Sequence, residues 1–288
     1  MSKKLNTLSD VWYDAFGLIK KWPRLLFPLS IVSFLEALWL ETIYFSIRSP
    51  LNAFFRPSLK RFFGEMNLHY PAFLLTVVPR LFGRGQILIY VFIGGVLTAV
   101  TIALAGALSE GRPFTLGAAW KKVGHRFLTL IAVSAFITFS LFFVTSREIL
   151  LFKAGFNVVG RGPLLRILVL LVRISPFLNF FIAIAVQSFV LFIFPLLILE
   201  NKKVFRAVWE SFVLGWKHFL RIYGLLLLPM VCYGPIWFLK ENTFFLVRRM
   251  PLYPEVNLWI LGVGILATLF VDTFVAVCAA LYFLRLKK

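Results

Sequence analysis

Three acidic residues stand inside long apolar stretches of the sequence, where a charged side chain is costly. Glu36 and Glu41 lie within residues 25–47, and Asp272 lies near the middle of residues 258–284. Insertion scales assign a charge at the centre of a membrane-spanning helix a cost of about 2.5–3.5 kcal/mol. Carboxyl groups at such depth can exchange protons or bind a cationic group, so the three form a candidate intramembrane polar site.

A purely structural role is the alternative for each of these carboxyl groups. The two deeper ones could be neutral and hydrogen-bonded to a nearby hydroxyl or amide, such as that of Thr273, Gln187 or Ser188. Glu41 lies closer to the end of its segment and could pair with Arg48, two turns further along. Both interpretations stay open on the sequence alone.

Few other residues have the type and spacing that catalysis requires. His69, His125 and His218 stand in separate connections, and none has a carboxylate or a second histidine at metal-ligand spacing. Cys232 and Cys278 lie inside apolar stretches, where a thiol behaves as a small apolar group. No Gly-rich phosphate-binding motif or serine elbow is present. We therefore expect no enzymatic activity, no cofactor and no metal.

The amino-acid composition indicates which class of protein holds these carboxyl groups in place. Apolar residues make up 60% of the chain and 34 residues are Phe, well above the ~45–50% apolar content of soluble proteins. A helix needs ~20 apolar residues to cross the ~30 Å hydrocarbon core. We predict one all-α, polytopic membrane domain over residues 1–288, with six transmembrane helices. Their ranges are about 25–47, 86–108, 127–146, 177–199, 219–239 and 258–284.

Two stretches fit less simply into six spans. Residues 163–199 would form a helix ~54 Å long, which exceeds the bilayer, so we expect a break at Pro176. The part before it, 164–174, then reads as a helix in the membrane interface. Residues 49–80 have a similar mixture of Phe and basic residues, and prolines that include Pro79 are expected to interrupt any long helix there.

Three basic, amphipathic stretches each run directly into an apolar segment. They centre on Trp12, Trp120 and Trp209, and each has apolar residues at helical spacing opposite basic ones. We predict three surface helices in a loose threefold repeat. The repeat units are about 9–108, 112–199 and 202–284.

These helices have residues that could anchor them at the membrane surface. The stretch around Trp209 is the clearest, because Arg206 precedes Glu210 by four residues on the polar face. The candidate anchors are Trp12, Trp120, Trp209, Trp216, Arg206 and Lys217. The helices are either extensions of the spans held by these anchors, or a collar that senses lipid or docks a partner.

The net charge of +19 indicates a partner that is negatively charged. Lys and Arg fall almost entirely between the apolar segments, where they would meet anionic phospholipid headgroups. We therefore expect anionic phospholipids rather than nucleic acid. With the termini inside, 17 of the 31 Lys and Arg residues lie on the inner side, which favours cytoplasmic termini.

Small residues recur every fourth position on the second predicted span. Gly95, Ala99, Ala103 and Ala107 would let another helix approach closely. The neighbour is either a helix of the same bundle or a second copy in a homodimer. A larger membrane protein complex is a further candidate partner.

One segment carries a resemblance to a known family. The stretch FPLLILENKKVFRAVWESFVLGWKHFLRIYGLLLLP, 194–229, resembles the superfamily of the glycerophosphoryl diester phosphodiesterase membrane domain and related six-helix bacterial inner-membrane proteins. Its matching positions are Glu200, Ala207, Trp209, Ser211, Trp216 and Lys217, with weaker similarity after Asp14 and Leu108. Glu210 replaces the usual Arg before the Ser, and we expect none of these residues to form a soluble phosphodiesterase domain. The resemblance implies six helices with surface helices between them.

Two functions fit this sequence. The first is a non-enzymatic protein of the bacterial cytoplasmic (inner) membrane that supports envelope or lipid organisation, or scaffolds a membrane complex. The second is a small transporter or permease that uses the intramembrane carboxyl groups. A transporter of this kind is typically built from inverted repeats around a polar site at mid-membrane, whereas the three units here run in the same direction. The first function is therefore favoured.

Overall fold

The computed structural model describes residues 8–112, 115–158, 163–243 and 255–287, with side chains throughout except at 145–158, 163–176 and 241. These residues form helices and turns and contain no strand. Six helical segments are long and apolar enough to cross a membrane, as the sequence predicts. They are α2 (Phe27–Phe45), the continuous helix Phe73–Ser109, α7 (Phe127–Val158), α8 (Pro163–Val190) with α9 (Ile193–Ile198), α11 (Phe219–Glu241) and α13 (Val256–Lys287).

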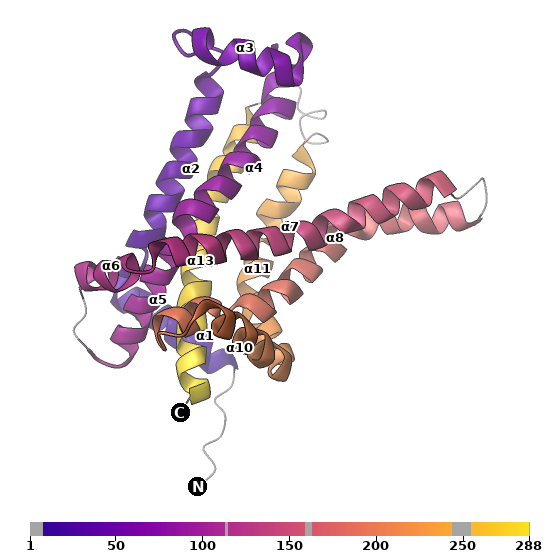
Figure 1. Cartoon of the computed structure of the whole chain (residues 1–288). Coiled ribbons are helices and arrows are strands. Elements are labelled where there is room, and N and C mark those ends of the chain that lie inside the picture. The colour runs from indigo at the N-terminus through magenta and orange to yellow at the C-terminus, as the bar shows by residue number, and fades with distance from the viewer. Residues whose placement is uncertain (1–7, 113–114, 159–162, 244–254, 288) are drawn as a thin grey trace.

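Three shorter helices lie at one end of the bundle (Figure 1). They are α1 (Leu8–Lys21), α6 (Leu116–Gly124) and α10 (Val204–Lys217), and the C-terminal end of α13 lies beside them. Each leads within a few residues into a spanning helix, namely α2, α7 and α11. The three surface helices are confirmed, whereas the limits of the repeat units stay a prediction. We call α1, α6 and α10 the collar.

The opposite end of the bundle is covered by α3 (Asn52–Phe63), which lies across the tops of the spanning helices (Figure 1). A short turn, η2 (Glu65–Leu68), follows it. Glu65 pairs there with Arg56 at 2.8 Å and with Lys60 at 2.7 Å, and these two cations lower the pKa of Glu65 to about 2. Residues from Phe73 onward belong to the next spanning helix, so the interfacial prediction for 49–80 does not apply to them, and for α3 it stays a prediction.

The helix after α3 begins earlier than the predicted span 86–108. It starts at the π-helical turn η3 (Phe73–Val77), continues as α4 (Val78–Ile89) and the π-helical turn η4 (Tyr90–Gly94), and ends with α5 (Gly95–Ser109). The expected interruption at Pro79 is wrong. Pro79 lies in the first turn of α4, where its missing N–H donor costs little because the preceding turn is already π-helical.

The predicted break at Pro176 is also wrong. Helix α8 continues through Pro176 to Val190, and the chain breaks at residues 191–192, before α9. A proline ring clashes with the carbonyl four residues earlier, so Pro195 disfavours a helix through Leu191. A membrane helix tolerates the single lost hydrogen bond at Pro176. The sequence also predicts that 164–174 lies in the membrane interface. The side chains of these residues lie outside those that the structure describes, so this stays a prediction.

Helices α7 and α8 form an antiparallel hairpin that extends obliquely beyond the rest of the bundle (Figure 1). The centre of the bundle is occupied by α13, which packs against α1, α2, α5 and α11.

The small residues of α5 face other helices of the bundle. Ala99 and Ala103 are buried, and a side chain added at Gly95 would meet the Ser134 hydroxyl of α7. This stripe therefore serves packing within the chain, which is the first of the two interpretations.

Candidate functional site

Asp272 of α13 meets Tyr90 of η4 in the interior of the bundle. The Tyr90 hydroxyl donates a hydrogen bond to the Asp272 carboxylate. Tyr90 is the first residue of the π-helical turn, and Gly94 leaves room for its ring, because a Cβ there would lie 2.8 Å from Tyr90 Cδ1. The π turn thus places an aromatic hydroxyl against an intramembrane acid.

Glu36 of α2 lies next to this pair and is fully buried, with 0% of its surface exposed. Gln86 of α4 lies beside it, and Asp272 and Lys240 are within electrostatic range. Neither oxygen of the Glu36 carboxyl has a hydrogen-bond partner in good geometry among the described residues. A buried carboxyl of this kind is energetically costly, which distinguishes Glu36 from a residue that only supports packing.

A cation completes this set of polar residues. Lys240, at the end of α11, donates to the Tyr233 hydroxyl at 2.9 Å, and its ammonium lies against Gly264, where a Cβ would be 2.8 Å from Nζ. Lys240 is in electrostatic range of Glu36, and Tyr233 of Tyr90. We call this set the intramembrane polar cluster: Glu36, Gln86, Tyr90, Tyr233, Lys240 and Asp272.

A cavity of about 180 Å³ reaches one side of the cluster. Asp272 and Tyr90 line it together with Gln187, and the rest is formed mainly by apolar residues of α5, α7, α8, α9, α11 and α13. Glu36 is not among the lining residues. The cavity therefore gives access to the Tyr90–Asp272 pair and leaves Glu36 enclosed.

The hydrogen-bond partners suggested by the sequence for the deep carboxyl groups are not the observed ones. The Thr273 hydroxyl donates to the Leu269 carbonyl at 2.7 Å, and the Ser188 hydroxyl donates to the Ile184 carbonyl at 2.9 Å. Each hydroxyl bonds within its own helix. The hydroxyl that donates to Asp272 is that of Tyr90, which reaches the carboxylate from another helix.

Glu41 stands apart from the cluster. Its side chain is exposed on the outer face of α2, and in the part of the chain that the structure describes it makes no ion pair. The pairing with Arg48 that the sequence suggested is wrong. Arg48 Nη2 donates to the Tyr44 hydroxyl at 2.7 Å instead, because Tyr44 is only one turn away on the same face.

The collar helix α10 packs through its smallest residues. Ala207, Ser211 and Gly215 are buried at four-residue intervals, and the Ser211 hydroxyl donates to the Phe189 carbonyl of α8 at 2.7 Å. A Cβ at Gly215 would lie 2.8 Å from the Phe189 Cα. Because small residues form the contact, the backbones of α8 and α10 approach closely.

Three aromatic residues of α10 are largely exposed, while Phe212 and one face of Trp216 stack on Phe189 of α8. Phe205 is 92% exposed, Trp216 is 73% exposed and Trp209 is 68% exposed. Arg206 and Lys217 on the same helix are also exposed. This face carries the aromatic and basic residues that are typical of the membrane–water interface.

The other two collar tryptophans differ in their surroundings. Trp12 is partly buried, and its indole N–H donates to the Leu225 carbonyl of α11 at 3.2 Å. Asp14 of the same helix pairs with Arg285 of α13. Trp120 of α6 is 38% exposed. Trp12 therefore fixes α1 to the bundle, whereas Trp120, like Trp209 and Trp216, is open to the surroundings.

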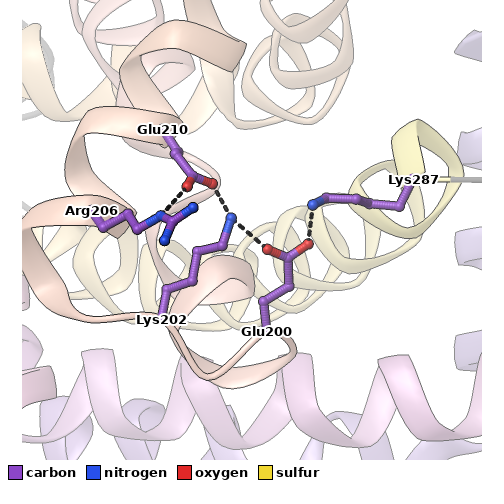
Figure 2. Close-up of polar contacts among 5 residues, drawn as sticks. All are labelled: Glu200, Lys202, Arg206, Glu210 and Lys287. Carbon is purple, nitrogen blue, oxygen red and sulfur yellow. Dashed lines mark hydrogen bonds and ion pairs between the residues drawn. The ribbon is translucent and has the colours of Figure 1, made fainter.

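An ion-pair network connects the link between α9 and α10 to the end of α13 (Figure 2). Lys202 pairs with Glu200 at 2.7 Å and also with Glu210, Arg206 pairs with Glu210 at 2.8 Å, and Lys287 pairs with Glu200. These five residues form the collar network.

The pKa values in the collar network follow from these contacts. Burial by itself raises the pKa of Glu200, but hydrogen bonds from Lys202 and Lys287 outweigh it and lower the pKa. Hydrogen bonds from Lys202 and Arg206 lower the pKa of Glu210 as well. Burial opposes the charge of Lys202, yet its two carboxylate partners raise its pKa. All three groups are therefore held in their charged forms.

Arg126 supports the same link from the start of α7. Its Nη1 donates to the carbonyls of Leu197 at 3.0 Å and Lys202 at 2.9 Å, and its Nη2 donates to the carbonyl of Asn201 at 3.2 Å. Asn201 has a φ of 58°, so the backbone turns sharply there. Sequence reasoning missed Arg126, since nothing in the pattern separates it from the other basic residues between spans.

Among the residues that the structure describes, no three His, Cys, Asp or Glu side chains come together as metal ligands would. In comparisons with known proteins, no protein family, no curated protein and no solved structure matches this chain.

Proposed function

We propose that this chain is a non-enzymatic protein of the bacterial cytoplasmic membrane that binds anionic phospholipid through its collar, and so organises lipid or scaffolds a membrane complex. The observation that carries the proposal is the outward aromatic face of α10, whose Phe205, Trp209 and Trp216 are more than two-thirds exposed. Aromatic side chains of this kind are favoured at the headgroup level of a bilayer.

Basic residues beside the aromatic face support the choice of an anionic lipid. Lys20 and Lys21 of α1, Lys121 and Lys122 of α6 and Lys217 of α10 are all exposed at this end of the bundle. Each cation near an anionic membrane surface contributes about 1 kcal/mol. Several of them therefore suffice to select anionic headgroups, and the selection weakens as salt is added.

The experiment compares two triple variants with matched charge. The collar variant replaces Lys121, Lys122 and Lys217 by Gln, and the control replaces three exposed cations from the opposite half of the molecule by Gln, namely Arg61, Arg80 and Arg84. Wild-type protein is purified from vesicles that contain equal amounts of anionic and zwitterionic phospholipid, and the retained lipid is quantified by mass spectrometry.

We expect the collar variant to lose at least about tenfold in enrichment of anionic lipid, from about 1 kcal/mol for each of three cations. The control variant should retain the wild-type enrichment. Equal enrichment in all three proteins, or equal loss in both variants, would contradict the proposal, because it would show that the collar has no special role.

Three further proposals belong with this function. The termini face the cytoplasm, as the distribution of Lys and Arg favours. The chain belongs to the superfamily that 194–229 resembles, which is supported by the six spans and surface helices but by no family match. A second copy of the chain or another membrane protein is the partner in a scaffold.

Proton-coupled transport is a second candidate, and one observation favours it. The cavity of about 180 Å³ reaches the Tyr90–Asp272 pair within the bundle. The test replaces Asp272 by Asn and measures proton uptake into vesicles with a pH-sensitive dye, together with the cellular phenotype of a deletion. Proton uptake that requires Asp272 would support transport. Full complementation by the Asn variant would exclude a role for its protonation.

A further inference from the structure

A lateral groove of about 520 Å³ runs along the outside of the bundle between α2 and α13. Its wall on α2 extends from Ser30 to Tyr44, and its wall on α13 extends from Leu258 to Leu269. Apart from Glu41 and two hydroxyl groups near the other end, its lining is almost wholly apolar. The groove opens sideways, toward the surface that faces lipid in a membrane.

The dimensions of the groove fit one hydrocarbon chain. From Ser30 to Glu41 and from Leu258 to Leu269 the helices rise ~16 Å, which is close to the ~15 Å of one leaflet of the hydrocarbon core. A volume of about 520 Å³ over this length corresponds to a width of ~6 Å. Such a width admits one extended hydrocarbon chain, whereas a second helix could contact the groove only through its side chains.

The charged residue that lines the groove, Glu41, lies at the α3 end. Glu41 and Tyr44 line the groove within the last turns of α2, where the headgroup region of that leaflet begins. Glu41 makes no ion pair within the described residues, and Arg48 lies next to Tyr44, to whose hydroxyl it donates at 2.7 Å. A carboxylate that lines the groove and a guanidinium bonded to a neighbouring lining residue thus lie at the same end of the groove.

We propose that this groove binds one acyl chain of a zwitterionic phospholipid whose headgroup has a primary amine. The ammonium group pairs with Glu41, the phosphate receives hydrogen bonds from Arg48, and the chain lies between α2 and α13. The complementary charges of Glu41 and Arg48 select a headgroup with both signs. This site is separate from the collar, which lies at the other end of the bundle and is proposed to bind anionic lipid.

Two glycines provide a matched pair of variants. A Cβ added at Gly262, on the groove, or at Gly234, on α11 away from it, would meet no atom within 4 Å. Gly262→Leu therefore adds a side chain to the groove wall at a position where its Cβ meets no neighbour, and Gly234→Leu makes the same change elsewhere in a span. Glu41→Gln removes the carboxylate and leaves the groove open.

The experiment exposes each protein to equal amounts of three phospholipids that share their acyl chains: one with a primary amine headgroup, one with a trimethylated amine and one with an anionic glycerol headgroup. Native mass spectrometry counts the lipid that stays bound after mild detergent removal. We expect wild type and Gly234→Leu to retain one amine lipid, at least fivefold over the trimethylated one. Gly262→Leu should lose the bound lipid, and Glu41→Gln should lose the preference between the two.

Equal retention of the three lipids by wild type, or unchanged retention by Gly262→Leu, would overturn the proposal. A wild-type dimer that Gly262→Leu dissociates would show that a second copy occupies the groove instead. The collar variant with Lys121, Lys122 and Lys217 replaced should keep the amine lipid. A failure of this site is thereby distinguished from a failure of anionic lipid binding at the collar.

Discussion

Arg126 illustrates how a single side chain can determine a connection. One guanidinium donates to three backbone carbonyls, at Leu197, Asn201 and Lys202, and so satisfies acceptors at the end of α9 and in the turn that follows. A planar group with several donors in a fixed geometry suits this task, whereas an ammonium group on a flexible chain does not reach all three.

Replacement of Arg126 by Lys is therefore expected to lower stability despite the unchanged charge. The variant should lose about 1–2 kcal/mol, since at least one carbonyl loses a donor that was charged. Thermal unfolding in detergent measures the effect. Arg84→Lys, at an exposed arginine of α4, is the control and should leave the midpoint unchanged. An equal midpoint for the two variants would show that the three bonds do not contribute.

The sequence identified the acids of the intramembrane polar cluster but not their partners. Glu36 and Asp272 stand out because a carboxyl at membrane depth is costly. Tyr90 and Gln86 carry no charge, so nothing in the pattern marks them, and their roles arise only when α2, η4, α4 and α13 come together. Lys240 escapes notice because it lies at the end of its span, where cations are common.

At the level of helices, α10 shows how a membrane changes the usual rule for amphipathic segments. In water the face with Trp209 and Trp216 would be buried. Here those residues are exposed, and Ala207, Ser211 and Gly215 make the contact with α8. Lipid and the interface solvate aromatic groups well, so close packing of small residues decides the orientation of the helix.

Gly215→Ala should loosen α10 from the bundle. The added Cβ would lie 2.8 Å from the Phe189 Cα and 3.0 Å from the Ser188 carbonyl oxygen, and backbone atoms cannot move aside as a flexible side chain can. We expect a loss of about 1–3 kcal/mol, as for overpacking elsewhere. Limited proteolysis in the link around Asn201, together with thermal unfolding, measures the change.

The control for this substitution is Gly117→Ala on α6, where a Cβ would meet no atom within 4 Å. Alanine favours a helix over glycine by about 1 kcal/mol, so this variant should be as stable as wild type or more so. If Gly215→Ala and Gly117→Ala had the same thermal stability, the close contact between α8 and α10 would not contribute to the stability of the protein.

The positions of breaks within helices were harder to predict from the sequence than the positions of the six spans. All six spans were expected from apolar length, and the structure places them within a few residues at most ends. The positions of breaks depend on local competition instead. Pro176 lies inside a continuous α8, whereas the chain breaks ahead of Pro195, and no single-residue rule distinguishes the two.

For the whole molecule, the collar network predicts a dependence of stability on pH. The pKa values of Glu200 and Glu210 are lowered from an ordinary value of 4.5. A carboxyl with a lowered folded pKa stabilises the protein above its unfolded pKa, and this contribution is lost as pH falls through the folded pKa. The unfolding temperature should stay level from about pH 7 to 5 and then fall below about pH 4.5.

The variant Glu210→Gln should flatten this acid-induced decrease, because it removes one of the carboxyl groups of the collar network that take up a proton at low pH. Glu110→Gln removes an exposed acid that pairs with Arg112 at 2.8 Å and serves as the control, since exposed pairs add little to stability. A decrease of the same size in wild type and Glu210→Gln would show that other groups control the acid response.

The position of α13 has a consequence for how the protein is made. This helix follows the other five spans in the sequence, yet it packs against α1, α2, α5 and α11 and carries the carboxylate that Tyr90 binds. The earlier spans therefore leave the ribosome without their central neighbour. Glu36 and Tyr90 are therefore exposed to lipid until α13 is inserted. Completion of the bundle is a late step of biosynthesis, during which an insertase or a membrane chaperone would need to shield these polar residues.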